Sequence, residues 1–457
     1  MSLVVTRPQI APFARTSIDP ITVEVISSTL SSIAEEMGKT LIKSAYSDNI
    51  KMRLDCSTAI FDAKGTTLVQ AEHIPLHLGS LLGMMDHILA SVDQTTVVPG
   101  DVFIGNDAYE GGSTHLQDIV LAEPVFIDGE LFGWVMNTAH HVDWTNLRHT
   151  HIFEEGLRIP PVRLYRAGIE QPDILKMILL NCQLPDLRVG DLRAQMACNR
   201  VGIERIKKVC AKYGKDVVVS AADAILDYSE RKTAAALSSI PSGRYTYEAK
   251  FETDLIENAL DLKLSIDVKD GEIFFDFTGN PLQVNAPVNA ILNGTKAMIY
   301  FAIKSVTDQD ILPNSGFYRR IHVSAPEGSV FNARPPAPVY SRQDLLARMV
   351  DMIWAALAEA IPDKVIAGCS GGFITTLTGN DPATGGFFVH NETLGGGWGA
   401  RSTKDGWDNI EVCCGNSMNM PIETLESEFP LKITRYELVQ DSGGPGTFRG
   451  GMSIRRA

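Results

Sequence analysis

The sequence predicts an α+β (mixed α/β) fold, built as a large subunit with several layers. Three observations support this class. Apolar residues repeat at helical spacing after Asp19-Pro20, two β-rich runs flank Asp128-Gly129, and alternating strands follow Pro241. With 457 residues, 44% of them hydrophobic, the chain can form about two to four domain-sized units.

The first region is predicted to span residues 17–240 and to open with a long amphipathic helix. Asp19 is a suitable N-cap, Pro20 suits the first helical turn, and apolar positions then repeat to about residue 45. The other expected elements of this region are strands within 55–70, a helix over about 78–92, a hairpin centred on 128–129, an irregular polar stretch to about 170, and helices over about 172–237.

The second region is predicted to span residues 241–457 and to be mixed α/β and rich in glycine. Alternating patterns predict strands over 245–253, 262–268 and 272–277, and helical patterns follow over about 286–306 and 344–361. Glycines dominate the sequence after residue 395. They favour tight turns, with a backbone-lined ligand surface as the alternative.

The hairpin has a strong turn signal. The apolar runs 119–127 and 131–138 lie on either side of Asp128-Gly129, a dipeptide that favours two-residue turns because it accepts positive φ. A turn at this position pairs Ile127 with Glu130.

The register of this hairpin decides which histidine faces Asp118. A regular ladder places Asp118 opposite Ala139, and strict alternation then puts His141, not His140, on the face of Asp118. Pro124 suggests a bulge or strand end that would shift the register. Both histidines therefore remain candidates.

A metal site is predicted beside the mouth of the hairpin. His115 and Asp118 lie three residues apart, and the hairpin returns His140 and His141 to the same place. Imidazole and carboxylate donors in this number suit a catalytic divalent transition metal (Zn, Mn or Fe) that keeps an open position. We expect His115, Asp118 and His140 as ligands, with His141 as the substitute if the ladder is regular.

Two further histidines have metal-like spacing. His73 and His77 are four residues apart, but Pro75 between them spoils the helical geometry that would aim both at one ion. We expect them to support the ligands or to lie in a loop.

Composition and charge exclude several classes of function. The net charge of −14 and the absence of basic runs argue against a nucleic-acid surface or binding to an anionic membrane. No apolar stretch approaches the ~18 residues of a membrane span, and the N-terminus lacks a signal-peptide pattern, so a cytoplasmic location is expected.

Seven cysteines without a C-x-x-C pair predict neither a disulfide framework nor a structural zinc site. Cys369, flanked by glycines, is a weak candidate nucleophile.

Ordered motifs along nearly the whole chain resemble the hydantoinase B family. This family includes the C-terminal half of 5-oxoprolinase, the B subunit of caprolactamase and the large subunits of acetone and acetophenone carboxylases. The motifs are DPITVEVI (19–26), AEHIPLHLGS (71–80), NDAYEGGSTHLQD (106–118), EGLRIPPV (155–162), GDLRAQ (190–195) and DSGG (441–444). Family members usually continue past the last motif. The resemblance therefore implies that a further C-terminal segment or a partner subunit completes the fold.

The resemblance implies a division of labour within a hetero-oligomer. A partner ATPase of the hydantoinase A type uses ATP to phosphorylate an amide or enol oxygen, and the B-type subunit completes the reaction at its metal. The H-x-x-D pair and later histidine that hold the metal in acetone carboxylase match His115, Asp118 and His140. Acidic residues that could orient a ligand or act as a base are Asp107, Glu154 and Glu155.

Three functions are compatible with these motifs. In the first, water bound to the metal opens a phosphorylated cyclic amide, as in a hydantoinase, oxoprolinase or lactamase. In the second, the metal site holds an enolate while a carboxyl donor reacts with it, as in a ketone carboxylase. In the third, the chain is a structural subunit. We favour hydrolysis, because cyclic-amide enzymes are the broader use of the family.

Overall fold

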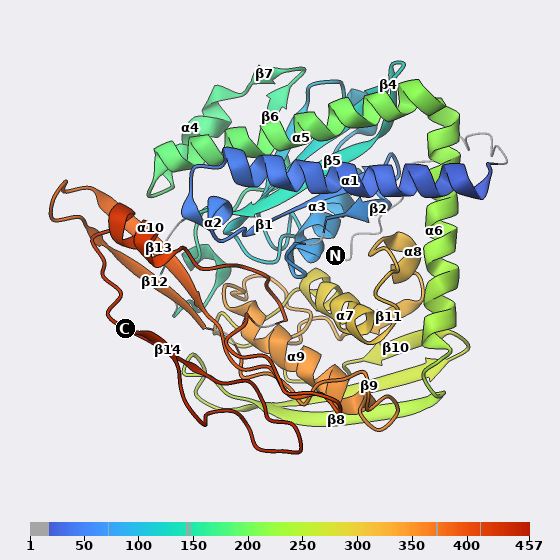
Figure 1. Cartoon of the computed structure of the whole chain (residues 1–457). Helices are drawn as coiled ribbons and strands as arrows, with labels where there is room; N and C mark the ends of the chain where they lie inside the picture. Colours follow the sequence, from blue (N-terminus) through green and yellow to red (C-terminus); the bar gives the residue numbers. More distant parts are fainter. Residues whose placement is uncertain (1–17, 72, 143–144, 146–147, 372, 412) are drawn as a thin grey trace.

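The computed structural model describes residues 18–457, except residues 72, 143–144, 146–147, 372 and 412 (Figure 1). Residue 17, where the first predicted region begins, and residue 72, within a family motif, lie outside the described part. The described chain combines long helices with several sheets, which confirms the predicted α+β (mixed α/β) class.

The larger sheet contains seven strands in the order β2-β1-β5-β4-β3-β6-β7, and neighbouring strands are antiparallel. Its members are β1 (Cys56–Asp62), β2 (Thr67–Gln70), β3 (Val102–Gly105), β4 (Asp118–Ile127), β5 (Glu130–His140), β6 (Val162–Arg166) and β7 (Ile169–Glu170). The hairpin β4–β5 lies inside this sheet, so its strands are buried along almost their whole length.

Helices cover both faces of this sheet. They are α1 (Pro20–Ser44), α2 (Asp48–Lys51), α3 (His77–Ser91), α4 (Pro172–Leu180), α5 (Pro185–Tyr213) and α6 (Lys215–Leu237), with the short 3-10 helices η1 (Gln94–Thr96) and η2 (Ile152–Glu154). The predicted start of α1 is confirmed, since the Asp19 side chain accepts a hydrogen bond of 3.0 Å from the Thr22 backbone N–H. Among the described residues, no helix is both long and apolar enough to cross a membrane.

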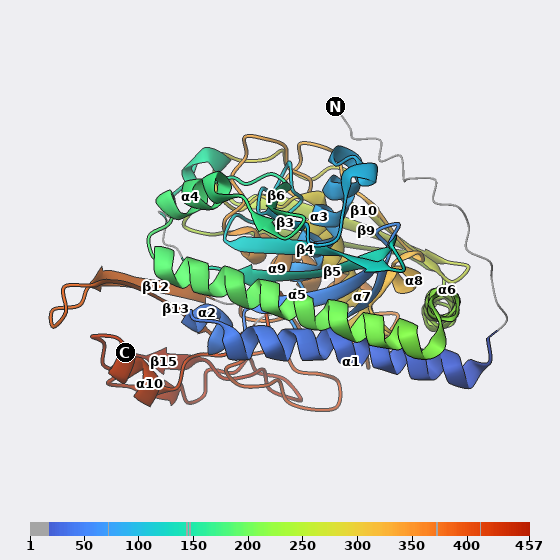
Figure 2. The same cartoon turned by 90° about the horizontal axis from the view of Figure 1, so that it is seen from above.

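The two faces of the sheet have separate cores. Helices α1 and α5 lie side by side on one face, where Met37 and Cys198 pack against strand residues such as Val135 (Figure 2). Helix α3 covers the other face, and its Met84 packs near Trp134. The mouth of the hairpin is thereby held between two packed layers.

The second half of the chain forms a smaller sheet in the order β11-β10-β9-β8. Its elements are β8 (Gly243–Phe251), β9 (Leu260–Lys269), β10 (Glu272–Asp276), α7 (Leu292–Val306), α8 (Ser315–Tyr318), β11 (Ile321–Ser324) and α9 (Arg342–Leu357), followed by β12 (Phe373–Asn380), β13 (Phe387–Leu394), α10 (Ile422–Glu428), β14 (Tyr436–Leu438) and β15 (Ile454–Arg456). Helices α7 and α9 share a core with this sheet, and that core also includes Leu76 and Leu78 from the first half. The division of the chain near residue 240 stays a prediction.

One predicted helix begins later than expected. The pattern placed its start near residue 286, whereas α7 begins at Leu292. The side chain of Asn289 accepts from the Val284 backbone N–H and donates to the carbonyls of Val284, Ala286 and Pro338. These bonds stabilise a compact turn instead of a helix.

The glycines near the C-terminus allow close approach of backbones. A Cβ at Gly397 would lie 2.0 Å from the Gly451 carbonyl oxygen, and a Cβ at Gly451 would lie 1.8 Å from the Trp407 carbonyl oxygen. Here glycine serves packing between chain segments.

Strand β4 carries one buried carboxyl group away from the hairpin mouth. Glu123 is 5% exposed, and its Oε1 has no hydrogen-bond partner in the described part of the chain. Burial raises the pKa of Glu123 from its ordinary 4.5 to about 7.

We expect Glu123→Gln to stabilise the protein above about pH 7. Because the folded-state pKa is raised, wild-type stability is lost as pH rises from about 4.5 through about 7, and the amide avoids this loss. The gain in unfolding free energy should be roughly 1–3 kcal/mol above pH 7 and should vanish at acid pH. Denaturant unfolding across this range measures it. A gain that is constant with pH would contradict the assignment.

Candidate metal centre

The hairpin turn has the predicted geometry. Asp128 and Gly129 both have positive φ, at 52° and 81°, and Ile127 pairs with Glu130. A two-residue turn of this kind matches the twist of the flanking strands.

A β-bulge then changes the register. Val125 pairs with Gly133 and Phe126 with Leu131, so Phe132 is the extra residue of β5. Beyond the bulge each partner is displaced by one, and Asp118 pairs with His140 instead of Ala139. The bulge lies one residue from Pro124, where the sequence suggested an irregularity.

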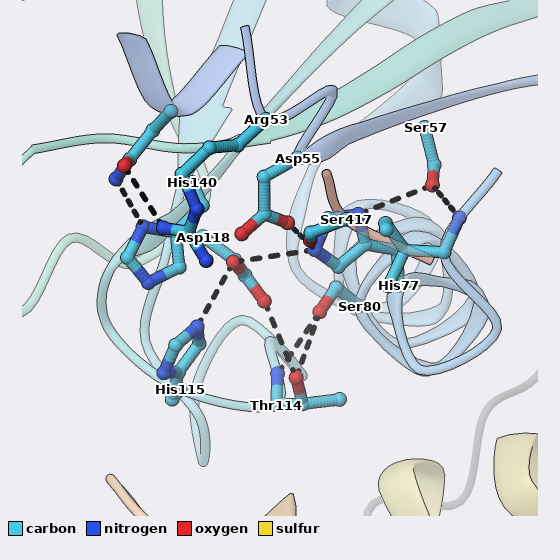
Figure 3. A network of polar contacts seen from close by, with 12 residues as sticks. Arg53, Asp55, Ser57, His77, Ser80, Thr114, His115, Asp118, His140 and Ser417 are labelled. Carbon is cyan, nitrogen blue, oxygen red and sulfur yellow. Dashed lines mark hydrogen bonds and ion pairs between the residues drawn. The ribbon is translucent and has the colours of Figure 1, made fainter. Parts of the chain in front are cut away.

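The register brings three donor side chains together (Figure 3). One ligand atom from each of His115, Asp118 and His140 lies within 4.8 Å of the other two. Nε2 of His115 is 2.9 Å from Oδ1 of Asp118, and the rings of His115 and His140 are 5.1 Å apart between centroids. Strand β4 begins at Asp118 and β5 ends at His140, so the sheet fixes two of the three donors.

The three donors fit a divalent transition metal. Nε2 of His115 and Oδ1 of Asp118 are close, yet neither completes a hydrogen bond of normal geometry within the described part of the chain. A bound cation would satisfy both of these buried polar atoms. Two imidazoles and one carboxylate are the donors that Zn, Mn and Fe accept, and three protein ligands leave positions open.

The pKa values of the three donor side chains favour the protonation states that bind a cation. Burial lowers the pKa of His115 to about 3, with a further contribution from the Arg342 charge, and burial also lowers the pKa of His140. Burial opposes ionisation of Asp118, but its contacts with His115 and with His77, whose own pKa is raised, outweigh burial and hold the pKa of this carboxyl well below its ordinary value. Neutral imidazoles beside an ionised carboxylate are the protonation states that a metal requires.

His77 supports the centre from the start of α3. Its Nε2 lies 3.4 Å from Oδ1 of Asp118 and 3.4 Å from Oδ1 of Asp55, and its Nδ1 lies 3.1 Å from the Ser57 hydroxyl. This agrees with the predicted supporting role, which sequence spacing alone could not place beside Asp118. His73 lies in the preceding loop, against Gly38 of α1.

Arg342 was missed by sequence reasoning. It begins α9, is 5% exposed, and its guanidinium lies 2.9 Å from Nδ1 of His115 and 3.5 Å from Oδ2 of Asp118. Its other contact in the centre is the Thr114 hydroxyl, at 3.1 Å. The centre therefore combines donors from the first half of the chain with a cation from the second. No local motif marks Arg342, since its partners lie more than two hundred residues away.

The residue next to His140 points elsewhere. His141 is buried, and its Nε2 pairs with the Gln195 side chain of α5 at 2.9 Å. The bulge thus selects His140, and the structure does not bring His141 to the three donors. His140 is itself held by Asn49 of α2, whose amide lies 3.1 Å from Nδ1 of His140.

Two of the predicted acidic residues have other partners. Asp107 accepts hydrogen bonds from the backbone N–H groups of Tyr109 and Glu110 and pairs with Arg158, so it orders its own loop. Glu154 is 40% exposed at its side chain and accepts from the Thr150 backbone N–H. The described contacts do not join either carboxylate to the three donors.

Glu155 is connected to the centre through Tyr340. It is 2% exposed, and its Oε1 accepts from the backbone N–H groups of Val339 and Tyr340 at 2.6 and 2.8 Å. The Tyr340 ring in turn lies 6.1 Å from the His115 ring. Burial raises the pKa of Glu155 to about 8, and its Oε2 has no hydrogen-bond partner in the described chain.

Comparison with known proteins gives consistent results. Residues 19–457 match the family described as Hydantoinase B/oxoprolinase. An uncharacterised protein of Methanocaldococcus jannaschii is 40% identical, and the match covers 96% of this chain and 78% of that protein. Caprolactamase subunit beta of Pseudomonas jessenii is 31% identical, and this match covers 96% of this chain and 78% of that protein.

Two solved structures share the fold. The crystal structure of ATP-dependent caprolactamase from Pseudomonas jessenii superposes with a TM-score of 0.87 at 30% identity, covering 96% of this chain and 78% of the other. A nucleotide-free acetone carboxylase structure superposes with a TM-score of 0.86 at 18% identity, covering 98% and 63%. The latter shows the fold alone.

We expect His140→Ala to lose metal and His141→Ala to keep it. The two substitutions remove the same group from adjacent residues, but only His140 lies among the donors. Affinity of the His140 variant for Zn, Mn or Fe should fall at least about tenfold. Elemental analysis after reconstitution measures this, with thermal unfolding as the check on folding. Equal metal content in both variants would rule out the assignment.

Proposed function

The chain belongs to the hydantoinase B/oxoprolinase family, and on this premise we propose that it is the metal-dependent subunit of an ATP-dependent cyclic amide hydrolase. A hydantoinase A-type ATPase subunit phosphorylates the amide oxygen, and this chain hydrolyses the activated intermediate. Relatives of this chain are named as subunits of multi-subunit enzymes, which implies a partner subunit.

The observation that carries the proposal is the convergence of His115, Asp118 and His140. These three residues would hold a divalent metal, which would supply Lewis acidity to activate water. The chain's own residues maintain the protonation and position of the donors. Asn49 fixes the His140 ring, and Arg342 contacts both His115 and Asp118.

Glu155 is the acidic residue that we propose as proton donor, in preference to Asp107 and Glu154. In ring opening, water adds to the activated carbon and loses a proton, the bond from this carbon to the ring nitrogen breaks, and the nitrogen takes a proton. A second water then hydrolyses the resulting acyl phosphate to the carboxylate and inorganic phosphate. A carboxyl group with a pKa of about 8 is protonated at neutral pH, while Asp118 is ionised. Two carboxyl groups whose environments separate their pKa values in this way suit different roles in one reaction.

Ketone carboxylation is the second candidate. It is favoured only by the fold, because the acetone carboxylase structure is 18% identical. The 31% identical relative is a caprolactamase subunit, which favours hydrolysis. A purely structural subunit would have no need of three converging donors and a buried cation beside them.

We expect no ATP turnover by the isolated chain. The only sequence resembling a phosphate-binding loop, Gly38-Lys39-Thr40, lies inside α1, where backbone N–H groups are already used. A coupled assay for ADP release tests this with and without the partner ATPase subunit. Sustained ADP release by the contaminant-free chain would overturn the division of labour.

Asp118→Ala should separate the two half-reactions of the complex. ADP or a phosphorylated intermediate should still form, whereas ring opening should fall by at least about a hundredfold. In heavy-oxygen water the wild-type complex should place label in the new carboxylate. If the complex instead incorporates labelled bicarbonate into a ketone in an ATP-dependent reaction and opens no cyclic amide, the proposed hydrolase function is wrong and the carboxylase function takes its place.

Glu155→Gln should slow ring opening by roughly 10²–10⁴-fold with normal metal content, because the amide cannot donate a carboxyl proton. Glu204→Gln on the exposed side of α5 is the matched control and should act as wild type. Loss of metal in the Glu155 variant would instead indicate a structural role.

A further inference from the structure

A large chamber lies beside the candidate metal centre. Its volume is about 1080 Å³, and its walls come from residues within the segments 57–58, 70–81, 297–318 and 393–436. Ser57 links the chamber to the centre, because its hydroxyl lies in the wall and 3.1 Å from Nδ1 of His77. His77 contacts Asp118, so the chamber ends close to the three donors (Figure 3).

The outer walls of the chamber are largely aromatic and apolar. The aromatic residues that line it include Tyr300, Phe301, Trp398, Trp407 and Tyr436. Several are fixed by other contacts: the Tyr300 ring stacks on Tyr318 with centroids 4.2 Å apart, and Nε1 of Trp398 donates to the Glu411 carbonyl at 2.9 Å. Rigid aromatic walls favour a bulky apolar ligand, because little side-chain entropy is lost on binding.

The charged groups of the chamber disfavour an acidic substituent on the ligand. Glu411 and Glu423 both line it, and burial raises the pKa of Glu411 to about 7. The cation Lys304 also lines it, but its Nζ donates to the carbonyls of Gln309 and Ile311. Above about pH 7 an acidic substituent would therefore meet two carboxylates, while the ammonium is held by backbone oxygens.

Glu411 is the polar group at the inner end. It accepts a hydrogen bond from the Ser417 backbone N–H, and Ser417 also lines the chamber. A Cβ at Gly415 would lie 2.3 Å from Oε1 of Glu411, so glycine at 415 leaves space for this carboxyl group. Glu411 can accept a hydrogen bond from the N–H of an amide while apolar side chains line much of the rest of the chamber.

We propose that this chamber binds cyclic amides whose ring substituent is bulky and apolar, and that it disfavours a ring substituent that carries a carboxylate. The proposal rests on the proposed function in taking a cyclic amide as the ligand. The amide lies at the Glu411 and Ser57 end, and the substituent lies against Tyr300, Phe301 and Trp398. The volume of the chamber, which far exceeds a bare five-membered ring, accommodates the substituent.

The test is a set of three hydantoins titrated into the wild-type protein by calorimetry. 5-Benzylhydantoin should bind at least about tenfold more tightly than unsubstituted hydantoin, because the benzyl group buries apolar area. Hydantoin-5-acetic acid should bind at least about tenfold more weakly than 5-benzylhydantoin. Equal affinities, or preference for the acid, would overturn the proposal.

Variants locate the binding. Phe301→Ala should weaken the binding of 5-benzylhydantoin by about tenfold, since the substitution removes part of the apolar wall. Phe153→Ala, at a phenylalanine that is 63% exposed, is the matched control and should bind as wild type. At pH 8, where Glu411 is ionised, Glu411→Gln should narrow the difference in affinity between the benzyl and acetic acid ligands, because it removes a carboxylate. If the affinities for all three hydantoins are unchanged in both chamber variants, the ligand binds elsewhere and the proposal is wrong.

The same titrations after chelation distinguish this proposal from the proposed function. Because the three donors do not line the chamber, 5-benzylhydantoin should bind equally well without metal. Retained binding after chelation, together with no ring opening by the metal-loaded complex with its ATPase partner and ATP, would support the chamber and reject the hydrolase. Loss of binding on chelation would reject the chamber as a separate site.

Discussion

The register of the β4–β5 hairpin is the constraint on which the candidate centre depends. Side chains alternate between the two faces of a strand, so a shift of one residue reverses the orientation of every side chain beyond it. The single extra residue Phe132 produces this shift and pairs Asp118 with His140. Helices on both faces of the sheet then hold the register, because slippage would expose residues that are buried on each side. Hydrophobic packing thereby determines which imidazole joins the centre.

The buried Asp118 carboxylate at the start of this hairpin is stabilised by contacts from several segments of the chain. Asp118 is fully buried, and ionising it there costs free energy unless charges and hydrogen bonds offset the loss of water. His77, His115 and Arg342 surround it, and each belongs to a different segment of the chain. The same carboxylate that would bind a cation therefore also joins the two halves of the protein. Stability and metal binding are coupled at this one residue.

Local patterns predicted much of this arrangement, and distant contacts account for what they missed. The Asp19 cap, the Asp128-Gly129 turn and the spacing of His115 and Asp118 are encoded within a few residues, and the structure has the expected α1, hairpin and donor pair. The choice between His140 and His141 depended on a bulge that Pro124 only suggested. Asp55, Arg342 and the chamber could not be predicted, because they arise where segments far apart in the sequence meet. The late start of α7 similarly follows from side-chain bonds of Asn289 that helical periodicity does not reveal.

The position of Arg342 also sets the order in which the centre can be built on the ribosome. Arg342 follows Asp118 by 224 residues. At about 5–20 residues per second, roughly 11–45 s separate the synthesis of the two. For most of this interval, once His140 has been made, the nascent chain contains all three donors, but its carboxylate lacks the guanidinium that accompanies it in the finished protein. The centre is therefore completed only after α9 has begun to emerge, and a nascent chain that ends before α9 contains every donor without the assembled site.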